Sequence, residues 1–203
     1  MSFLPSPTAV ETIADQLASQ GWAVIPDFLP SADIARLAQD VRHSHAQGEL
    51  RHAGISKSRI INTELRGDEI LWLSEHTLTA AQRDYLGCME TLRQSLNRDL
   101  QLGLFEFECH VAVYPPGSFY RKHLDNFQHS NQRVLTCILY LNQNWQDADG
   151  GQLRMYLDDG SMDISPTAGT LVAFLSSRYW HEVLPAQRER LSMTGWFKQR
   201  DPA

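Results

Sequence analysis

Hydrophobic residues recur every three to four positions in three stretches of the first hundred residues. This spacing gathers them on one face of a helix, so each stretch is predicted to be helical and to pack against a core. Thr8 with Glu11 forms a capping-box pattern before the first stretch, and Gly21 closes it. Thr79 with Gln82 repeats the pattern before the third. The predicted helices cover about 8–20, 31–47 and 79–96.

From Phe105 onward the pattern changes to short β-like runs separated by turns. Asp149-Gly150-Gly151 and Asp158-Asp159-Gly160 are typical hairpin turn signals. Many short strands joined in this way favour a sandwich or a jelly-roll barrel. The predicted strands are Cys109–Tyr114, Arg133–Leu141, Gln152–Leu157, Thr170–Leu175 and Arg190–Phe197, after an earlier run at Trp22–Ile25.

The segment 49–76, between the second and third helices, has little clean periodicity, and a connection of this length is usually functional or mobile. The chain is therefore predicted to be α+β, with N-terminal helices supporting a jelly-roll barrel in a single domain over 1–203. Residues 1–104 are expected to be mainly helical support that includes the mobile loop, and residues 105–200 to form the barrel core.

Charge and cysteine content limit the possible partners and the cellular compartment of the protein. The formal net charge of −6 disfavours nucleic-acid binding, which needs a basic surface to displace phosphate counterions. The start of the chain does not resemble a secretory signal, and no run approaches the roughly 18 apolar residues that span a bilayer. Three cysteines, Cys88, Cys109 and Cys137, make a disulfide framework unexpected. These features predict a cytoplasmic protein.

His123-Leu124-Asp125 carries the candidate chemistry. Side chains two apart in a strand point to the same face, so the imidazole and the carboxylate would project together. His181, which opens another β-like run, is predicted to supply a second imidazole. Two histidines and one carboxylate are the donor set of non-haem Fe(II) oxygenases. His110 and His129 are competing candidates, but neither has a carboxylate two residues away on a strand.

An arginine nine residues after His181 complements this set. Strict alternation would place Arg190 on the opposite face, but the intervening Pro-Ala-Gln-Arg reads as a turn that resets the phase. Inside a barrel, its guanidinium would suit the planar carboxylate of a dicarboxylate cosubstrate. Arg188 is the alternative for this role, although its neighbours place it in the turn.

Several stretches, in order, resemble the prolyl hydroxylases that modify hypoxia-inducible factor and their bacterial counterparts, the bacterial prolyl hydroxylase domain proteins. The resemblance implies a double-stranded β-helix fold and a requirement for Fe(II), 2-oxoglutarate and O₂, with ascorbate as reductant. The matching stretches are RGDEILW at 66–72, YPPG at 114–117, YRKHLDN at 120–126, TCILYLN at 136–142, GGQLR at 150–154 and HEVLPA at 181–186, followed by Arg190 and Trp196.

The same resemblance implies roles for individual residues. It makes His123, Asp125 and His181 the iron ligands, and it assigns the distal carboxylate of 2-oxoglutarate to Arg190 and Tyr140. The residues expected to line the cosubstrate pocket are Tyr114, Thr194, Leu153 and Trp196.

Two further expectations concern the surroundings of the site. Asp68 and Arg133 are expected to form an ion pair that sets the 49–76 segment against the barrel. The loop between Tyr114 and His123 and the stretch after Asp125 depart from the pattern of the animal enzymes. Both lie beside the expected substrate entrance, so the substrate preference does not carry over.

The resemblance implies hydroxylation of a prolyl residue in a protein at position 4, with elongation factor Tu as the candidate partner. The chemistry couples oxidative decarboxylation of 2-oxoglutarate to hydroxylation of the substrate. Segment 49–76, with Arg51, Lys57 and Arg59, is a candidate lid over the peptide. Two alternatives stay open: a hydroxylase of free proline or another small metabolite, and a non-enzymatic jelly-roll binding protein that holds a metal. The oligomeric state is not predicted.

Overall fold

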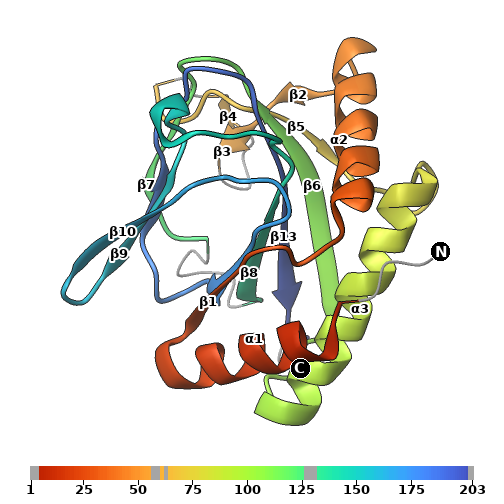
Figure 1. Ribbon diagram of the computed structural model, residues 1–203, viewed down its shortest axis with the longest axis vertical. Helices are drawn as coiled ribbons and strands as arrows, with labels where there is room; N and C mark the ends of the chain where they lie inside the picture. Colours follow the sequence, from red (N-terminus) through yellow and green to blue (C-terminus); the bar gives the residue numbers. More distant parts are fainter. Residues whose placement is uncertain (1–4, 56–59, 62–63, 126–131, 201–203) are drawn as a thin grey trace.

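The computed structural model describes residues 5–55, 60–61, 64–125 and 132–200, and its three helices all lie in the N-terminal half (Figure 1). They are α1 (Pro7–Gln20), α2 (Ser31–Ala46) and α3 (Ala80–Leu100). Pro7 occupies the first turn of α1, where its missing N–H costs nothing, and Ser6 accepts from the Ala9 N–H. The cap is therefore Ser6, and the predicted cap at Thr8 was wrong.

The other helix boundaries follow the sequence closely. The capping box at Thr79 and Gln82 is confirmed, with each side chain bonded to the backbone of the other residue. Gly21 ends α1 in the left-handed conformation, as its position after the last apolar residue predicted. The expected cap at Ser31 is one residue inside α2, which begins after Pro30 with no side-chain cap.

The strands form an antiparallel jelly roll of two sheets and a small hairpin. The larger sheet has the order β1-β11-β8-β13-β6-β5-β2, and the smaller sheet has the order β10-β9-β12-β7. β3 pairs with β4 in a separate two-stranded sheet. The strands are β1 (Trp22–Ile25), β2 (Arg51–His52), β3 (Gly54–Ile55), β4 (Ile60–Ile61), β5 (Glu69–Trp72), β6 (Glu106–Tyr114), β7 (Tyr120–His123), β8 (Arg133–Tyr140), β9 (Leu153–Leu157), β10 (Gly160–Ile164), β11 (Leu171–Leu175), β12 (His181–Val183) and β13 (Arg190–Lys198).

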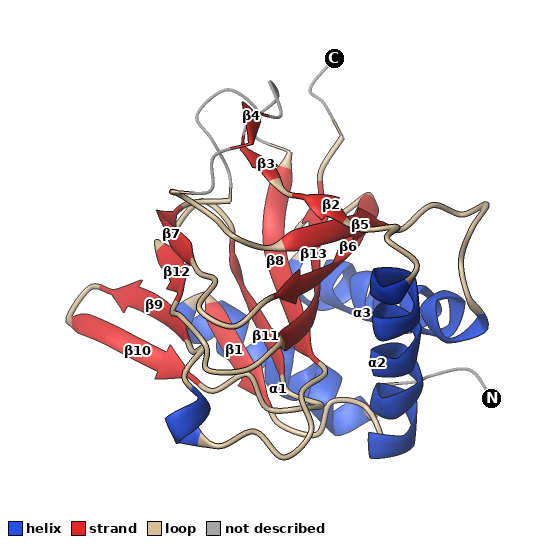
Figure 2. Cartoon of the chain, turned by 90° about the horizontal axis from the view of Figure 1, so that it is seen from above, coloured by secondary structure: helices blue, strands red, loops and turns tan. Residues whose placement is uncertain are grey.

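The larger sheet lies between the helices on one side and the smaller sheet on the other (Figure 2). One cluster of buried apolar side chains joins the three helices to the outer face of this sheet. A second cluster fills the space between the two sheets. The central strands β8, β11 and β13 are consequently buried almost throughout, because both of their faces are covered.

The sequence predicted a loop over 49–76, but part of this segment forms strands. Its strand β5 pairs with β6, and β2 pairs with β5, so the segment extends the larger sheet at its edge. Strands this short give no visible alternation of apolar and polar residues. The residues Lys57 and Arg59, proposed as part of a lid, lie outside the described residues.

The two predicted turn signals had different outcomes. Asp158 and Asp159 connect β9 to β10 in a hairpin, as predicted. Asp149 instead ends a short 3₁₀ helix (η1, Asp147–Asp149), and Gly150 bridges to Ala186. This glycine turn therefore leads into β9 beside the chain that precedes β13.

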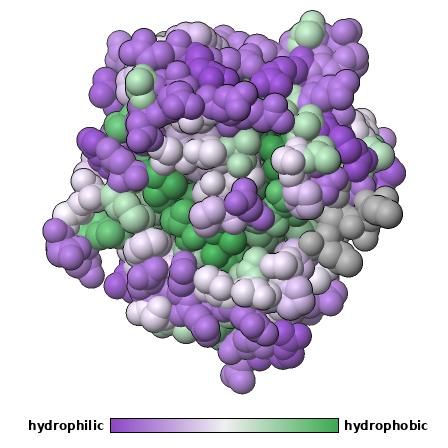
Figure 3. All heavy atoms as spheres, in the orientation of Figure 1, coloured by the Kyte–Doolittle hydropathy of each residue, from purple (hydrophilic) through white to green (hydrophobic). Residues whose placement is uncertain are grey.

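The surface differs from one part of the molecule to another. On the face seen in Figure 1, apolar residues gather in the middle, with hydrophilic residues above and below them (Figure 3). In the described part of the chain, no helix combines the length and the apolar character needed to cross a membrane.

Candidate metal centre

His123, Asp125 and His181 come together at one end of the space between the sheets. His123 is the last residue of β7 and His181 the first of β12, and these two residues are paired across the smaller sheet. Asp125 follows two residues after His123, where the chain has left the strand. The three side chains predicted from the sequence to converge therefore do so.

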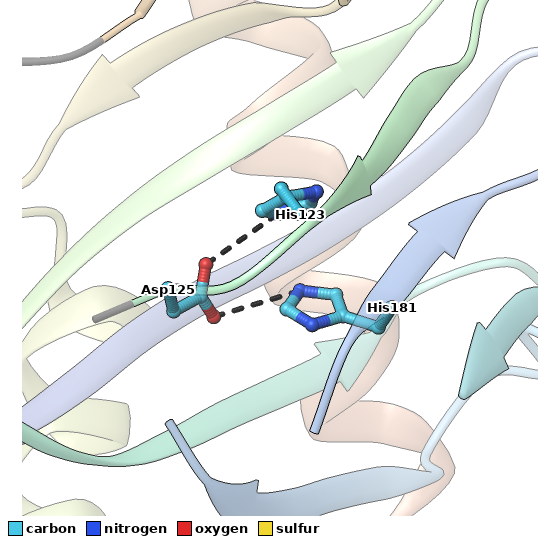
Figure 4. Close-up of side chains that lie close together, drawn as sticks. All are labelled: His123, Asp125 and His181. Atoms are coloured by element: carbon cyan, nitrogen blue, oxygen red, sulfur yellow. Dashed lines mark ion pairs between the residues drawn. The ribbon is translucent and has the colours of Figure 1, made fainter. Parts of the chain in front are cut away.

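The facing atoms are suited to a shared metal ion. One ligand atom from each residue lies within 4.8 Å of the others. The two Asp125 carboxylate oxygens face one histidine each, with His123 Nε2 at 3.5 Å from Oδ1 and His181 Nε2 at 3.6 Å from Oδ2 (Figure 4). No other such group of three is found among the residues that the structure describes.

Backbone carbonyls fix the histidine tautomers. His123 Nδ1 lies 2.7 Å from the carbonyl oxygen of Arg121, and His181 Nδ1 lies 3.1 Å from that of Tyr179. Because a carbonyl only accepts, each Nδ1 carries the hydrogen and each Nε2 keeps its lone pair for a metal. The third ligand is oriented as well, since the Thr136 hydroxyl donates to Asp125 Oδ2 at 2.8 Å.

Burial and neighbouring groups together set the protonation states of His181 and Asp125. Burial lowers the pKa of His181 to about 4, against the opposing effect of Asp125, so the imidazole is neutral near pH 7. Burial alone would raise the pKa of Asp125, but its interaction with His181 and its hydrogen bond with His123 hold that pKa well below its usual range. The site thus offers a neutral His181 imidazole and an ionised Asp125 carboxylate beside the His123 ring.

Arg190 lies in the same cavity, with only 1% of the residue exposed. The sequence argument needed a phase reset between His181 and Arg190, and the structure gives the reason. His181 belongs to the smaller sheet and Arg190 to the larger one, so alternation does not carry over between them. Arg188 lies in the preceding turn, near Asp149 and half-exposed, so it is not part of the cavity.

The end of the Arg190 side chain is left unpaired. Its Nε donates to the Gly151 carbonyl at 2.9 Å, but Nη1 and Nη2 are buried without a hydrogen-bond partner among the described residues. The Tyr140 hydroxyl is in the same condition, and Arg190 Cζ lies 5.0 Å from the Tyr140 ring centroid. A Cβ at Gly151 would come within 3.2 Å of Arg190 Cδ, so glycine permits this close approach.

Alternate residues of β13 line one wall of the cavity, as the two-residue period of a strand requires. Thr194 and Trp196 are among them, and Tyr114 pairs with Arg190 across β6 and β13. Leu153 lines the opposite wall from β9. Tyr140 is fully buried and does not itself line the cavity, but it lies beside Arg190, which does. All six residues expected around the cosubstrate are therefore near the cavity.

The remaining sequence candidates fall elsewhere. His110 lies in the cavity wall, where its ring contacts those of Trp72 and Trp196, and it is not a member of the three-residue group. His129 and the stretch from Phe127 lie outside the described residues.

The expected ion pair between Asp68 and Arg133 was wrong. Asp68 accepts two hydrogen bonds from Arg66, and Arg133 pairs with Glu108 instead. Arg66 bridges to Tyr120 of β7 and is only two residues from Asp68, so its guanidinium lies within reach of the carboxylate.

Two contributors to the site were not found from the sequence. Thr136 belongs to one of the matching stretches, but no role of its own was predicted for it. A polar residue in an otherwise apolar strand could have indicated its contact with Asp125. Tyr120 stacks on His123, with ring centroids 3.6 Å apart. Spacing concealed this contact, because residues three apart in a regular strand lie on opposite faces.

A jelly roll that presents two histidines and one carboxylate around a shared point defines the class of non-haem Fe(II) oxygenases. Residues 109–198 match the family model described as the 2OG-Fe(II) oxygenase superfamily. Arg190 and Tyr140 supply buried, unpaired donors that fit a carboxylate, so the cavity also fits the cosubstrate of this class.

Comparison with known proteins narrows the class. The chain is 30% identical to "Prolyl hydroxylase EGLN3" of Mus musculus, over 93% of this chain and 83% of that protein. It is 46% identical to a solved Pseudomonas putida prolyl-4-hydroxylase, with a TM-score of 0.85 over 94% of this chain and 99% of that one. A solved prolyl hydroxylase from Trichoplax adhaerens is 29% identical, with a TM-score of 0.88 over 94% of this chain and 89% of that one.

The chain belongs to the Fe(II)- and 2-oxoglutarate-dependent prolyl hydroxylases. It is accordingly a dioxygenase that uses Fe(II), 2-oxoglutarate and O₂, with ascorbate as the reductant typical of the family. Two further animal relatives are longer proteins, of which the chain spans 29% and 47%.

Proposed function

We propose that this chain hydroxylates a prolyl residue of a protein at position 4. In this proposal His123, Asp125 and His181 would hold Fe(II), which would activate O₂, the oxidant of the reaction. The observation that carries the proposal is the cavity itself, about 1010 Å³ in volume, which extends from these three residues to a charged rim.

Arg190 and Tyr140 bind the distal carboxylate of 2-oxoglutarate. The support is the set of three buried donors, Nη1 and Nη2 of Arg190 and the Tyr140 hydroxyl, that have no partner in the described structure. A carboxylate would pair with the guanidinium and neutralise its buried charge. Burial raises the pKa of Tyr140 to about 12, against the effect of Arg190, so its hydroxyl remains a donor.

The remaining pocket residues orient the cosubstrate and limit water. The Tyr114 ring centroid lies 5.0 Å from Arg190 Cζ and forms a side of the carboxylate end. Leu153 and Thr194 line the path towards the metal end, and Trp196 lies further along β13. Apolar walls around reacting groups exclude water, which strengthens the electrostatic interactions within the site.

The shape of the cavity supports a polypeptide substrate. Its volume lies at the upper end of the range for small-molecule sites, roughly 300–1,000 Å³. The outer part is lined by charged side chains and by Trp72, which is 44% exposed. An extended peptide has backbone and side chains to occupy this outer part, whereas free proline would fill only the inner part.

The choice of protein substrate rests on relatives. The solved Trichoplax adhaerens enzyme is in complex with a peptide fragment of hypoxia inducible factor. The bacterial members of the family suggest elongation factor Tu for this chain. We propose elongation factor Tu as the substrate to test first.

We also propose that residues 1–203 work as one catalytic domain. The buried cluster shared by the three helices and the larger sheet supports this proposal, because the barrel wall and the helices enclose the same apolar core.

The proposal is tested by measuring conversion of 2-oxoglutarate to succinate with Fe(II) and ascorbate. Purified elongation factor Tu, free L-proline, and the macromolecular and small-molecule fractions of a bacterial lysate are added separately. We expect stimulation by elongation factor Tu and by the macromolecular fraction, with one oxygen atom added at a prolyl residue by mass spectrometry. The Asp125→Ala protein in the same mixtures is the control.

Stimulation only by free proline or by the small-molecule fraction would overturn the protein substrate but keep the oxygenase chemistry. If the macromolecular fraction stimulates turnover but purified elongation factor Tu does not, only the choice of elongation factor Tu as the substrate would be overturned. Product analysis then identifies the hydroxylated carbon, and any position other than 4 would correct the regiochemistry.

A further inference from the structure

Tyr120 makes an unusually close contact with a proposed iron ligand. Its ring and the His123 imidazole are stacked, with centroids 3.6 Å apart and planes only 17° from parallel. Tyr120 also lines the cavity and is partly buried. The imidazole plane is therefore set by an aromatic surface as well as by the hydrogen bond from Nδ1 to Arg121.

An irregularity in the smaller sheet makes this stack possible. Between β7 and β12, His123 is opposite His181 and Tyr120 is opposite Val183. Three steps along β7 thus match two steps along β12, which is the geometry of a β-bulge. The additional residue shifts the phase, so Tyr120 and His123 share one face although they are three residues apart.

The Tyr120 ring is itself held in place by Arg66. Arg66 Cζ lies 4.2 Å from the Tyr120 ring centroid, and Arg66 bridges to Tyr120 through the main chain. Asp68, only 1% exposed, accepts from Arg66 Nε at 2.7 Å and from Nη2 at 2.6 Å. This two-point pairing fixes the plane of the guanidinium over the ring.

The two histidines differ in what holds them. His181 is buried at 3% exposure, and Phe174 packs against its ring edge at 4.8 Å between centroids. His123 ends its strand and is more exposed than His181. Apart from the His181 ring, Tyr120 is the aromatic neighbour recorded for His123 among the described residues.

We propose that Tyr120, held by Arg66 and Asp68, is a positioning residue that fixes the His123 imidazole for metal binding. The inference rests on the proposed role of His123 as an iron ligand. Tyr120 acts through His123, so its loss weakens metal affinity and alters the geometry of the bound ion. Outer-shell partners of metal ligands typically contribute about 10- to 100-fold in affinity or activity.

The experiment measures Co(II) binding to the metal-free full chain, with no cosubstrate and no turnover. The affinity is obtained by titration, and the visible absorption of bound Co(II) reports its coordination geometry. Tyr120→Leu removes the stacking surface, whereas Tyr120→Phe keeps the ring and removes only the hydroxyl. Tyr156→Leu is the matched control, because Tyr156 lies on the outer face of the same sheet and bonds Glu182.

We expect Tyr120→Leu to bind Co(II) about 10-fold or more weakly with a changed spectrum. Tyr120→Phe and Tyr156→Leu should keep the wild-type affinity and spectrum. Unchanged binding in Tyr120→Leu would overturn the inference alone, whereas failure of the wild-type chain to bind Co(II) would overturn the metal site itself. If Tyr120→Leu does not fold, Tyr120→Met is measured in its place and judged by the same outcomes.

Discussion

The two ends of the cavity are built in opposite ways. At the metal end, each of the three proposed ligands has a hydrogen bond to another protein group. The Nδ1 atoms of His123 and His181 donate to carbonyls, and Asp125 accepts from Thr136. At the other end, two guanidinium nitrogens of Arg190 and the Tyr140 hydroxyl are buried without a described partner.

The metal end shows how side chains are oriented before a ligand binds, and the carboxylate end shows a buried charge that a ligand would neutralise. The metal end can hold its geometry before any ligand arrives, because each ligand has a second contact that fixes its orientation. The carboxylate end contains the buried Arg190 guanidinium, which has no carboxylate partner among the described residues, a condition that costs several kcal/mol. We therefore expect 2-oxoglutarate to neutralise the buried charge of Arg190 at one end of the cavity. At the other end, the metal ligands should already be oriented before it binds.

Asp125→Ala gives the largest expected effect at the metal end. Removing the carboxylate deletes a proposed ligand, so Fe(II) affinity and turnover should fall by at least about 100-fold, the upper range for loss of an outer-shell partner. Anaerobic metal titration and succinate formation measure the two losses. Asp163→Ala is the control, because Asp163 pairs with Arg154 on the outer face of the smaller sheet. Full turnover in Asp125→Ala would remove the basis for the iron assignment.

Arg190→Met tests the carboxylate end. Loss of a buried, hydrogen-bonded charge pair typically costs about 2–5 kcal/mol, so the KM for 2-oxoglutarate should rise about 30-fold to several thousand-fold. Metal affinity without cosubstrate should be unchanged, which separates the two ends. Arg188→Met is the matched control, since this arginine is half-exposed in the turn.

The same substitution makes a stability prediction. Without cosubstrate, Arg190→Met should unfold at a higher temperature than the wild-type chain, because methionine replaces a buried unpaired charge. Added 2-oxoglutarate should stabilise the wild-type chain but not the variant. A variant with a wild-type KM would show that Arg190 does not bind the cosubstrate.

The two ends of the cavity should also affect stability at opposite ends of the pH range. The pKa of His181 is about 4 when folded and 6.5 as a free group, so its stabilising contribution is complete above pH 6.5 and is lost as the pH falls towards 4. The pKa of Tyr140 rises from 10 to about 12, so its contribution is complete below pH 10 and is lost as the pH rises towards 12. A difference of one between the folded and unfolded pKa of a group changes the free energy of unfolding by about 1.4 kcal/mol.

Urea unfolding of the metal-free chain at several pH values measures both losses. His110, whose pKa burial lowers to about 3, contributes to the acid loss, so His110→Phe is measured alongside. An acid loss that disappears completely in His110→Phe would contradict the contribution of His181.

The features predicted from the sequence were those that depend on local pattern. Helical spacing and the Thr79 capping box located α3, and the motif around His123 located the metal end. The short strands β2 and β5 were missed, because two to four residues carry no periodic signal and are held by pairing with β6.

Contacts that depend on strand register were beyond the sequence. The stack of Tyr120 on His123 requires a bulge, and a bulge is visible only when both strands are paired. The choice of Arg66 over Arg133 as partner of Asp68 likewise depends on where the chain bridges to β7. The inward direction of Arg190 needed the further knowledge that it belongs to the other sheet.

Tyr140→Phe gives the smallest expected effect and the finest test of the carboxylate end. It removes one hydroxyl donor and leaves the buried ring, so the affinity for 2-oxoglutarate should fall by about 0.5–1.5 kcal/mol, or roughly 2- to 12-fold. Because the hydroxyl has no described partner, the cosubstrate-free chain should lose no stability. Tyr85→Phe is the matched control, since Tyr85 has an equally buried, unpaired hydroxyl in the helical core, far from the cavity lining. Equal 2-oxoglutarate affinity in Tyr140→Phe and the wild-type chain would leave Arg190 as the sole proposed anchor, and a larger loss than in Arg190→Met would reverse the assigned order of the two donors.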